Sequence, residues 1–66
     1  MKTVYKYINF VIGLPNEWTV WNNKSDDYLG VIVYNKRWKE WEFIPEPNTA
    51  YTTQCLLDLA DFIKQL

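Results

Sequence analysis

The residue types that carry most catalytic chemistry are scarce in this chain of 66 residues. Its only serine, Ser25, stands beside Asp26 and Asp27, so a hydroxyl and two carboxylates could form a nucleophile or help to hold a divalent cation. Activation of the serine would need a general base, and histidine, the usual one, is absent. Two carboxylates are also too few for a complete oxygen cage around a cation. We therefore interpret the segment as a solvated turn and predict no metal site.

Cys55 and the pair Glu40 and Glu42 are the other candidates. A thiolate can be favoured near the start of a helix, but we interpret this single cysteine as a small buried residue. It permits no disulfide within the chain and, without histidine, no zinc site built on cysteine and histidine. Glu40 and Glu42 would share one side of a strand, and we interpret them as charges that keep that side soluble. With no glycine-rich phosphate loop either, the sequence predicts neither an enzyme nor a cofactor.

Residues 29–45 predict the β-hairpin around which the other elements are arranged. Two runs of alternating side chains flank a polar connection at residues 35–37, and Pro45 ends the second run. This connection places Tyr34 opposite Trp38. The same register collects on one apolar side of the sheet the side chains of Leu29, Val31, Val33, Trp41 and Phe43.

Two further strands and one helix complete the predicted fold. Residues 3–12 and 17–22 are rich in β-branched and aromatic side chains and indicate strands, the first pairing with the second or with its counterpart in another chain. Residues 52–66 indicate a helix that begins at Thr52 or, alternatively, at Asn48. Its apolar stripe holds Leu56, Leu59, Ala60, Phe62, Ile63 and Leu66, with Asp58 and Asp61 outside it. The prediction is an α+β fold, an antiparallel β-meander of three to four strands with one C-terminal helix packed on one face.

Length and charge narrow the classes of protein further. Residues 1–66 are enough for one small core, so we expect a single domain. The net charge is −1 without a strongly basic segment, which argues against recognition of nucleic acid or anionic membranes by charge alone. No run approaches the length of a membrane span, and the first residues lack the apolar stretch of a signal peptide. We expect a cytoplasmic protein with no membrane partner and no small-molecule substrate.

The chain has more aromatic side chains than one helix is expected to cover. The chain has four tryptophans, five tyrosines and three phenylalanines. The predicted register turns several large side chains toward solvent on the side opposite the helix, namely Tyr5, Tyr7, Trp21, Ile32, Tyr34 and Trp38. Clustered exposed aromatics favour a binding patch, and cross-strand pairing that stabilises the sheet is the alternative. Together with the adjoining cationic turn, the candidate binding face consists of Trp21, Tyr34, Lys36, Arg37, Trp38 and Lys39.

Two segments resemble the sheet and helix of the AP2-like DNA-binding domains, including the arm-binding domains of phage integrases: LGVIVYNKRWKEWEF and, after a connector, LLDLADFI. The resemblance spans about residues 18–66. It implies that arginine, lysine and tryptophan side chains enter the DNA major groove, and the positions carried over are Lys36, Arg37, Trp38 and Lys39. In size and composition the chain is also similar to small orphan proteins of phages and prophages of Gram-positive bacteria, which implies an accessory role.

Two functions are therefore predicted for the candidate binding face. The first is a non-enzymatic module that binds a protein partner or forms a homodimer, since outward aromatic side chains suit such a contact. The alternative is a small DNA-binding regulator in which the turn at residues 36–39 contacts phosphates. Glu40 and Glu42 would repel phosphates, so the protein-binding function is preferred.

Overall fold

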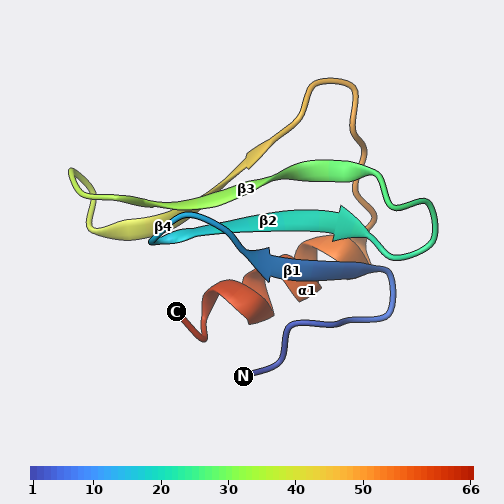
Figure 1. Cartoon of the computed structure of the whole chain (residues 1–66), viewed down its shortest axis with the longest axis horizontal. Coiled ribbons are helices and arrows are strands. Elements are labelled where there is room, and N and C mark those ends of the chain that lie inside the picture. Colours follow the sequence, from blue (N-terminus) through green and yellow to red (C-terminus); the bar gives the residue numbers. More distant parts are fainter.

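The computed structural model describes all of residues 1–66 and confirms the α+β meander (Figure 1). Four strands come first and one helix last. Their bounds are β1 Ile8–Ile12, β2 Glu17–Asn22, β3 Tyr28–Asn35, β4 Glu40–Pro45 and α1 Thr53–Ile63. All strand pairs are antiparallel and the order in the sheet is β1-β2-β3-β4, so each strand pairs with the next one along the chain.

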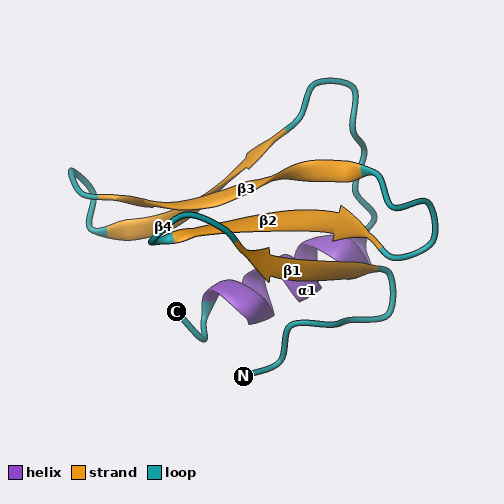
Figure 2. Cartoon of the chain, in the orientation of Figure 1, coloured by secondary structure: helices purple, strands orange, loops and turns teal.

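The molecule has two layers, because α1 lies against one side of the sheet (Figure 2). β1 pairs with β2 of the same chain, from Ile8 opposite Asn22 to Ile12 opposite Trp18, which settles the alternative of pairing with another chain. The single helix, α1, is neither long nor apolar enough to cross a membrane.

The predicted register of the central hairpin is wrong. Tyr34 lies opposite Trp41, not opposite Trp38, and Ile32 lies opposite Phe43. The connection is longer than expected, residues 36–39, because the Asn35 side-chain oxygen accepts the backbone N–H groups of the two residues Arg37 and Trp38 (3.0 and 3.1 Å) and holds a turn there.

In the observed register, the side chains of β3 face the opposite sides of the sheet from those predicted. Ile32 is fully buried against the helix layer, whereas Val31 and Val33 face the opposite side of the sheet. Gly30 explains why this side of β3 can face inward, since a Cβ there would stand 2.4 Å from the carbonyl oxygen of Ile44 and 2.8 Å from the Phe43 ring. Phe43 fills the space that a side chain at position 30 would need.

A β-bulge interrupts the pairing of β2 with β3. Val20 lies opposite Gly30, but the next residue, Trp21, lies opposite Tyr28, so Leu29 is the extra residue. Leu29 packs against the core. The bulge also places Tyr28 on the same side of the sheet as Trp21, away from the helix.

The first predicted strand is too long, and its first half turns back on its second half. Val4 makes a single β-bridge with Asn9, and the Phe10 N–H donates to the Thr3 carbonyl at 2.8 Å. Tyr5, expected on the solvent side, is only 7% exposed. Its ring makes a T-shaped contact with the Phe10 ring, with centroids 5.6 Å apart and 81° between the planes. This contact with an apolar ring favours burial of the tyrosine.

The helix contributes the centre of the core. The Phe62 ring stacks on Phe10 with centroids 3.9 Å apart, and Trp18 meets Phe62 edge-on at 5.0 Å. The Thr52 hydroxyl oxygen accepts the Cys55 N–H at 3.3 Å, which confirms Thr52 as the N-cap. The buried hydrophobic residues of the whole chain are Tyr5, Ile8, Phe10, Val20, Ile32, Leu59 and Phe62.

The apolar stripe of α1 is rotated relative to the prediction. Leu56 and Ala60 are exposed, whereas Asp58, expected outside the stripe, is buried. The segment before β1 packs along the Asp58 flank of the helix, as the bond between Tyr5 and Asp61 shows. The Asp58 flank of α1 therefore packs against the rest of the protein, and part of the predicted apolar stripe is exposed to solvent.

Candidate functional site

The side of the sheet opposite α1 is the first candidate site. We call it the outer face and define it by the alternation of side chains along the observed register. Its aliphatic, aromatic and hydroxyl-bearing members are Val11, Thr19, Trp21, Tyr28, Val31, Val33 and Ile44. Val11 and Ile44 are each 49% exposed, so this face retains accessible apolar surface at both edges of the sheet.

An aromatic pair occupies one end of the outer face. The rings of Trp21 and Tyr28 lie 5.3 Å apart between centroids and are tilted by 55°. The indole Nε1–H of Trp21 donates to the Thr19 hydroxyl at 2.9 Å, and that hydroxyl donates to the Val11 carbonyl at 3.1 Å. This chain of bonds fixes the indole and satisfies its donor. A partner meeting this end would therefore find a rigid aromatic surface without a free indole donor.

Burial near this aromatic pair also affects the Tyr28 hydroxyl. The pKa of Tyr28 is raised above its ordinary value, first by burial and then by the charges of Glu46 and Glu17. Tyr28 therefore stays neutral throughout the physiological range and offers a hydrogen-bond donor at the rim of the outer face.

Glutamates occupy the other end of the outer face. Glu17 and Glu42 lie on either side of Val33, in the two strands that flank β3, and Glu40 lies opposite Asn35. The Asn35 amide nitrogen donates to Glu42 Oε2 at 3.2 Å. The four strands contain these three glutamates and no lysine or arginine. The outer face is therefore apolar and acidic, with no cation among its strands.

The structure separates the six residues of the predicted binding face. Trp21 lies on the outer face as expected, but Tyr34 lies on the opposite side of the sheet, with its ring 5.4 Å from that of Trp41. The other four, Lys36, Arg37, Trp38 and Lys39, form the loop between β3 and β4. Trp38 is 69% exposed there. Tyr28, Val31 and Val33 also lie on the outer face, which local sequence patterns do not reveal because their side depends on the bulge and on the length of the hairpin loop.

The residues considered for catalysis form local turn contacts. The Ser25 hydroxyl donates to Asp27 Oδ2 at 2.9 Å, and the Asn22 side-chain oxygen accepts the N–H groups of Lys24 and Ser25. No three carboxylate or thiol side chains are close enough to share a metal ion. Cys55 is partly buried beside an open cavity of about 680 Å³ at the start of α1.

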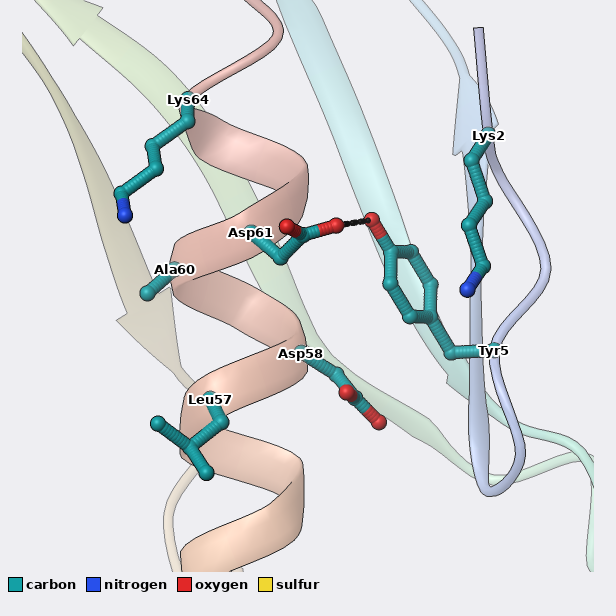
Figure 3. A pocket seen from close by; sticks show the side chains of 7 residues that line it. All are labelled: Lys2, Tyr5, Leu57, Asp58, Ala60, Asp61 and Lys64. Carbon is teal, nitrogen blue, oxygen red and sulfur yellow. Dashed lines mark hydrogen bonds between the residues drawn. The ribbon is translucent and has the colours of Figure 1, made fainter.

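A groove between the segment before β1 and α1 is a second candidate (Figure 3). Its volume is about 420 Å³. Figure 3 shows Tyr5 and Asp61 pointing toward one another across it, and the Tyr5 hydroxyl donates to Asp61 Oδ2 at 2.6 Å. The Lys2 ammonium lies 4.4 Å from the centre of the Tyr5 ring. The lining residues are Lys2, Tyr5, Leu57, Asp58, Ala60, Asp61 and Lys64.

The tyrosine and the two aspartates of this groove already have hydrogen-bond partners. Burial first, then the bond to Asp61 and the charges of Asp61 and Asp58, raise the pKa of Tyr5 to about 12. A tyrosine with this pKa stays protonated at neutral pH and does not act as a base there. Asp58 Oδ1 accepts the Gln54 side-chain amide at 2.8 Å. The groove therefore ties the first residues of the chain to the helix, and the outer face remains the better candidate for binding.

Neither a protein-family model, nor a curated protein, nor a solved structure matches this chain.

Proposed function

We propose that this chain is a non-enzymatic protein-binding module whose outer face contacts a partner surface that is both apolar and basic. The observation that carries the proposal is the composition of that face. A fixed aromatic pair, accessible aliphatic side chains and three glutamates share it, and its strands contain no cation.

The apolar part of the outer face supports a protein partner. Protein interfaces are enriched in aromatic side chains at their centres, and the Trp21 and Tyr28 rings already lie in contact. The Thr19 hydroxyl fixes the Trp21 indole, and the Tyr28 ring packs against it. Binding would therefore cost little side-chain entropy at this end.

The charged part favours a basic partner over a second copy of the chain or a nucleic acid. Glu17, Glu40 and Glu42 attract lysine and arginine side chains and repel phosphates. A second copy would bring the same three acids to the contact. We therefore prefer a basic protein segment over the homodimer.

DNA binding remains the second candidate function because of the loop between β3 and β4. Lys36, Arg37 and Lys39 lie together there beside the exposed Trp38 ring, a combination that can contact phosphates and stack on bases. An accessory role of the kind implied by the resemblance to small phage proteins is compatible with either function.

Selection from a library of short random peptides, with the intact chain as target, tests the proposed function. We expect recovered sequences that combine lysine or arginine with aliphatic or aromatic residues. Two variants of exposed isoleucines provide the control. Ile44→Lys places a bulky cation on the outer face of β4 and should weaken binding, whereas Ile12→Lys alters a residue that is 62% exposed on the other side of the sheet and should not.

Two results would count against the proposed function. One is recovery of acidic sequences, and the other is equal binding of the recovered peptides to both variants. Fluorescence anisotropy with a labelled DNA duplex at low salt tests the alternative. Binding that falls steeply with salt and is lost in Arg37→Glu would favour DNA.

A further inference from the structure

The two edges of the sheet differ in how their backbone groups are satisfied. At the β1 edge, the Phe10 N–H donates to the Thr3 carbonyl at 2.8 Å and the Ile8 carbonyl accepts the Tyr5 N–H at 2.9 Å. The segment before β1 thus covers that edge. At the β4 edge, no backbone hydrogen bond outside the sheet involves any residue of β4, and no side chain bonds to its backbone. β4 is therefore an open edge.

The alternation of hydrogen-bonded pairs between β3 and β4 identifies the backbone groups of β4 that have no partner. The Glu46 N–H donates to the Leu29 carbonyl at 2.9 Å, one position beyond the pair of Gly30 and Pro45. In an antiparallel ladder, hydrogen-bonded and non-hydrogen-bonded pairs alternate. Glu40, Glu42 and Ile44 therefore bond to β3, and the N–H and C=O groups of Trp41 and Phe43 point away from it. These are the groups that a further strand would meet.

We propose that β4 accepts an extended basic segment of a partner protein as an antiparallel fifth strand, hydrogen-bonded to the backbone of Trp41 and Phe43. This inference rests on the proposed function and states how the basic, apolar partner lies on the molecule. Addition of a strand to an exposed edge is a common mode of peptide recognition, in which the backbone supplies affinity and alternate side chains supply specificity.

The side chains of β4 specify an alternating partner sequence. Glu40 and Glu42 lie on the outer face, so the partner residues opposite them are lysine or arginine. Trp41 and Phe43 lie on the helix side and are partly buried against the core, so the partner residues opposite them are apolar. Strand side chains alternate between faces, so the segment reads apolar, basic, apolar, basic.

The same glutamates disfavour a second copy of the chain at this edge. If β4 paired with another β4 so that Trp41 met Phe43, then Glu42 would lie opposite the Glu42 of the other copy. Like charges directly opposite one another destabilise a sheet, and charged side chains on edge strands commonly prevent such pairing. A basic segment relieves this repulsion.

A peptide of alternating valine and lysine, blocked at both ends, tests the inference in amide NMR titrations of the full chain. A strand's backbone groups point alternately to its two sides, so methylation of every second amide selects one side of the probe. In the proposed pairing the valine amides meet β4 and the lysine amides point away. We expect methylation of the valine amides to weaken binding about tenfold, through the loss of two or more hydrogen bonds, and methylation of the lysine amides to leave affinity unchanged.

Two further readouts locate the site. The Trp41 and Phe43 amides should gain protection from hydrogen exchange when the unmodified peptide binds. Glu42→Lys should weaken binding of the valine–lysine peptide and strengthen binding of a peptide in which glutamate replaces lysine.

Equal affinity of the two methylated peptides, or no binding of the unmodified peptide, would overturn the proposal that a fifth strand pairs with β4. Shifts confined to Val11, Trp21 and Tyr28, with Trp41 and Phe43 unchanged, would overturn it as well and leave the proposed function standing. The proposed function fails separately, when Ile44→Lys and Ile12→Lys bind the selected peptides equally.

Discussion

The hydroxyl of Tyr5 donates to Asp61 Oδ2 at 2.6 Å, across 56 positions of sequence. The bond joins the segment before β1 to the last turns of α1. Gln65 adds a second connection, since its side chain both accepts the Lys2 N–H and donates to the Lys2 carbonyl, each at 2.8 Å. The two ends of the molecule thus hold each other over one flank of the helix (Figure 3).

Tyr5→Phe should destabilise the folded chain by about 1–2 kcal/mol, because it removes this hydrogen bond and keeps the ring against Phe10. Urea unfolding followed by circular dichroism measures the change. Tyr7→Phe is the matched control, since Tyr7 is exposed and lies two residues away. An equal loss in both variants would show that the bond contributes nothing specific.

The same tyrosine predicts a loss of stability in alkali. Its pKa is about 12 in the folded chain against an ordinary value of 10.0. The unfolded chain therefore ionises first as the pH rises. The contribution is complete below pH 10.0 and is lost between there and about 12. The free energy of unfolding of the wild type should fall more steeply over that range than that of Tyr5→Phe.

Tyr28→Phe should further reduce the fall in the free energy of unfolding with rising pH, since the pKa of Tyr28 is also raised. The double variant should show the shallowest dependence. Parallel slopes for the wild type and Tyr5→Phe would contradict the assignment.

Gly30→Ala should be severely destabilising, by about 2–4 kcal/mol, because an added Cβ would overlap the Ile44 carbonyl and the Phe43 ring. The backbone of Gly30 also has a φ of 155°, which residues with a side chain rarely adopt. Gly13→Ala is the matched control, since the nearest backbone atom would be 4.0 Å from its new Cβ. Thermal unfolding of the two variants separates them, and similar midpoints would refute the close approach of Phe43 to β3.

Thr52→Ala should cost about 1 kcal/mol of stability, because the Thr52 hydroxyl accepts the Cys55 N–H at the start of α1. Thr53→Ala, one residue inside the helix, supplies the comparison and should lie near the wild type. Chemical unfolding provides the free energies. If Thr53→Ala were the more damaging change, the helix would begin elsewhere.

The sequence predicted the type and order of the elements because each depends on local patterns. Alternation marks the strands, and spacing of three and four residues marks the helix. The register of the hairpin was beyond reach because it depends on the loop, where Lys39 adopts a φ of 57° that is uncommon for lysine. One added loop residue turned Ile32 and Tyr34 to the other side of the sheet and moved Val31 and Val33 to the outer face.

The position of Tyr5 was equally beyond local reasoning. A strand pattern that runs through residue 5 gives no sign that the chain reverses there. The reversal is stabilised by Phe10, the neighbouring backbone and Asp61, and the last of these belongs to a distant element. Of the six residues of the candidate binding face, Trp21 alone lies on the outer side of the strands as expected, since its place follows from a strand whose phase was predicted correctly.

The stacking of Phe62 on Phe10 has a consequence for synthesis of the protein. The sheet precedes the helix in the chain, so Phe10, Val20 and Ile32 are synthesised before the side chain that covers them. Until α1 has left the ribosome, the nascent strands cannot bury their apolar side and can expose it to chaperones. The fold is therefore completed only when Phe62 reaches the sheet.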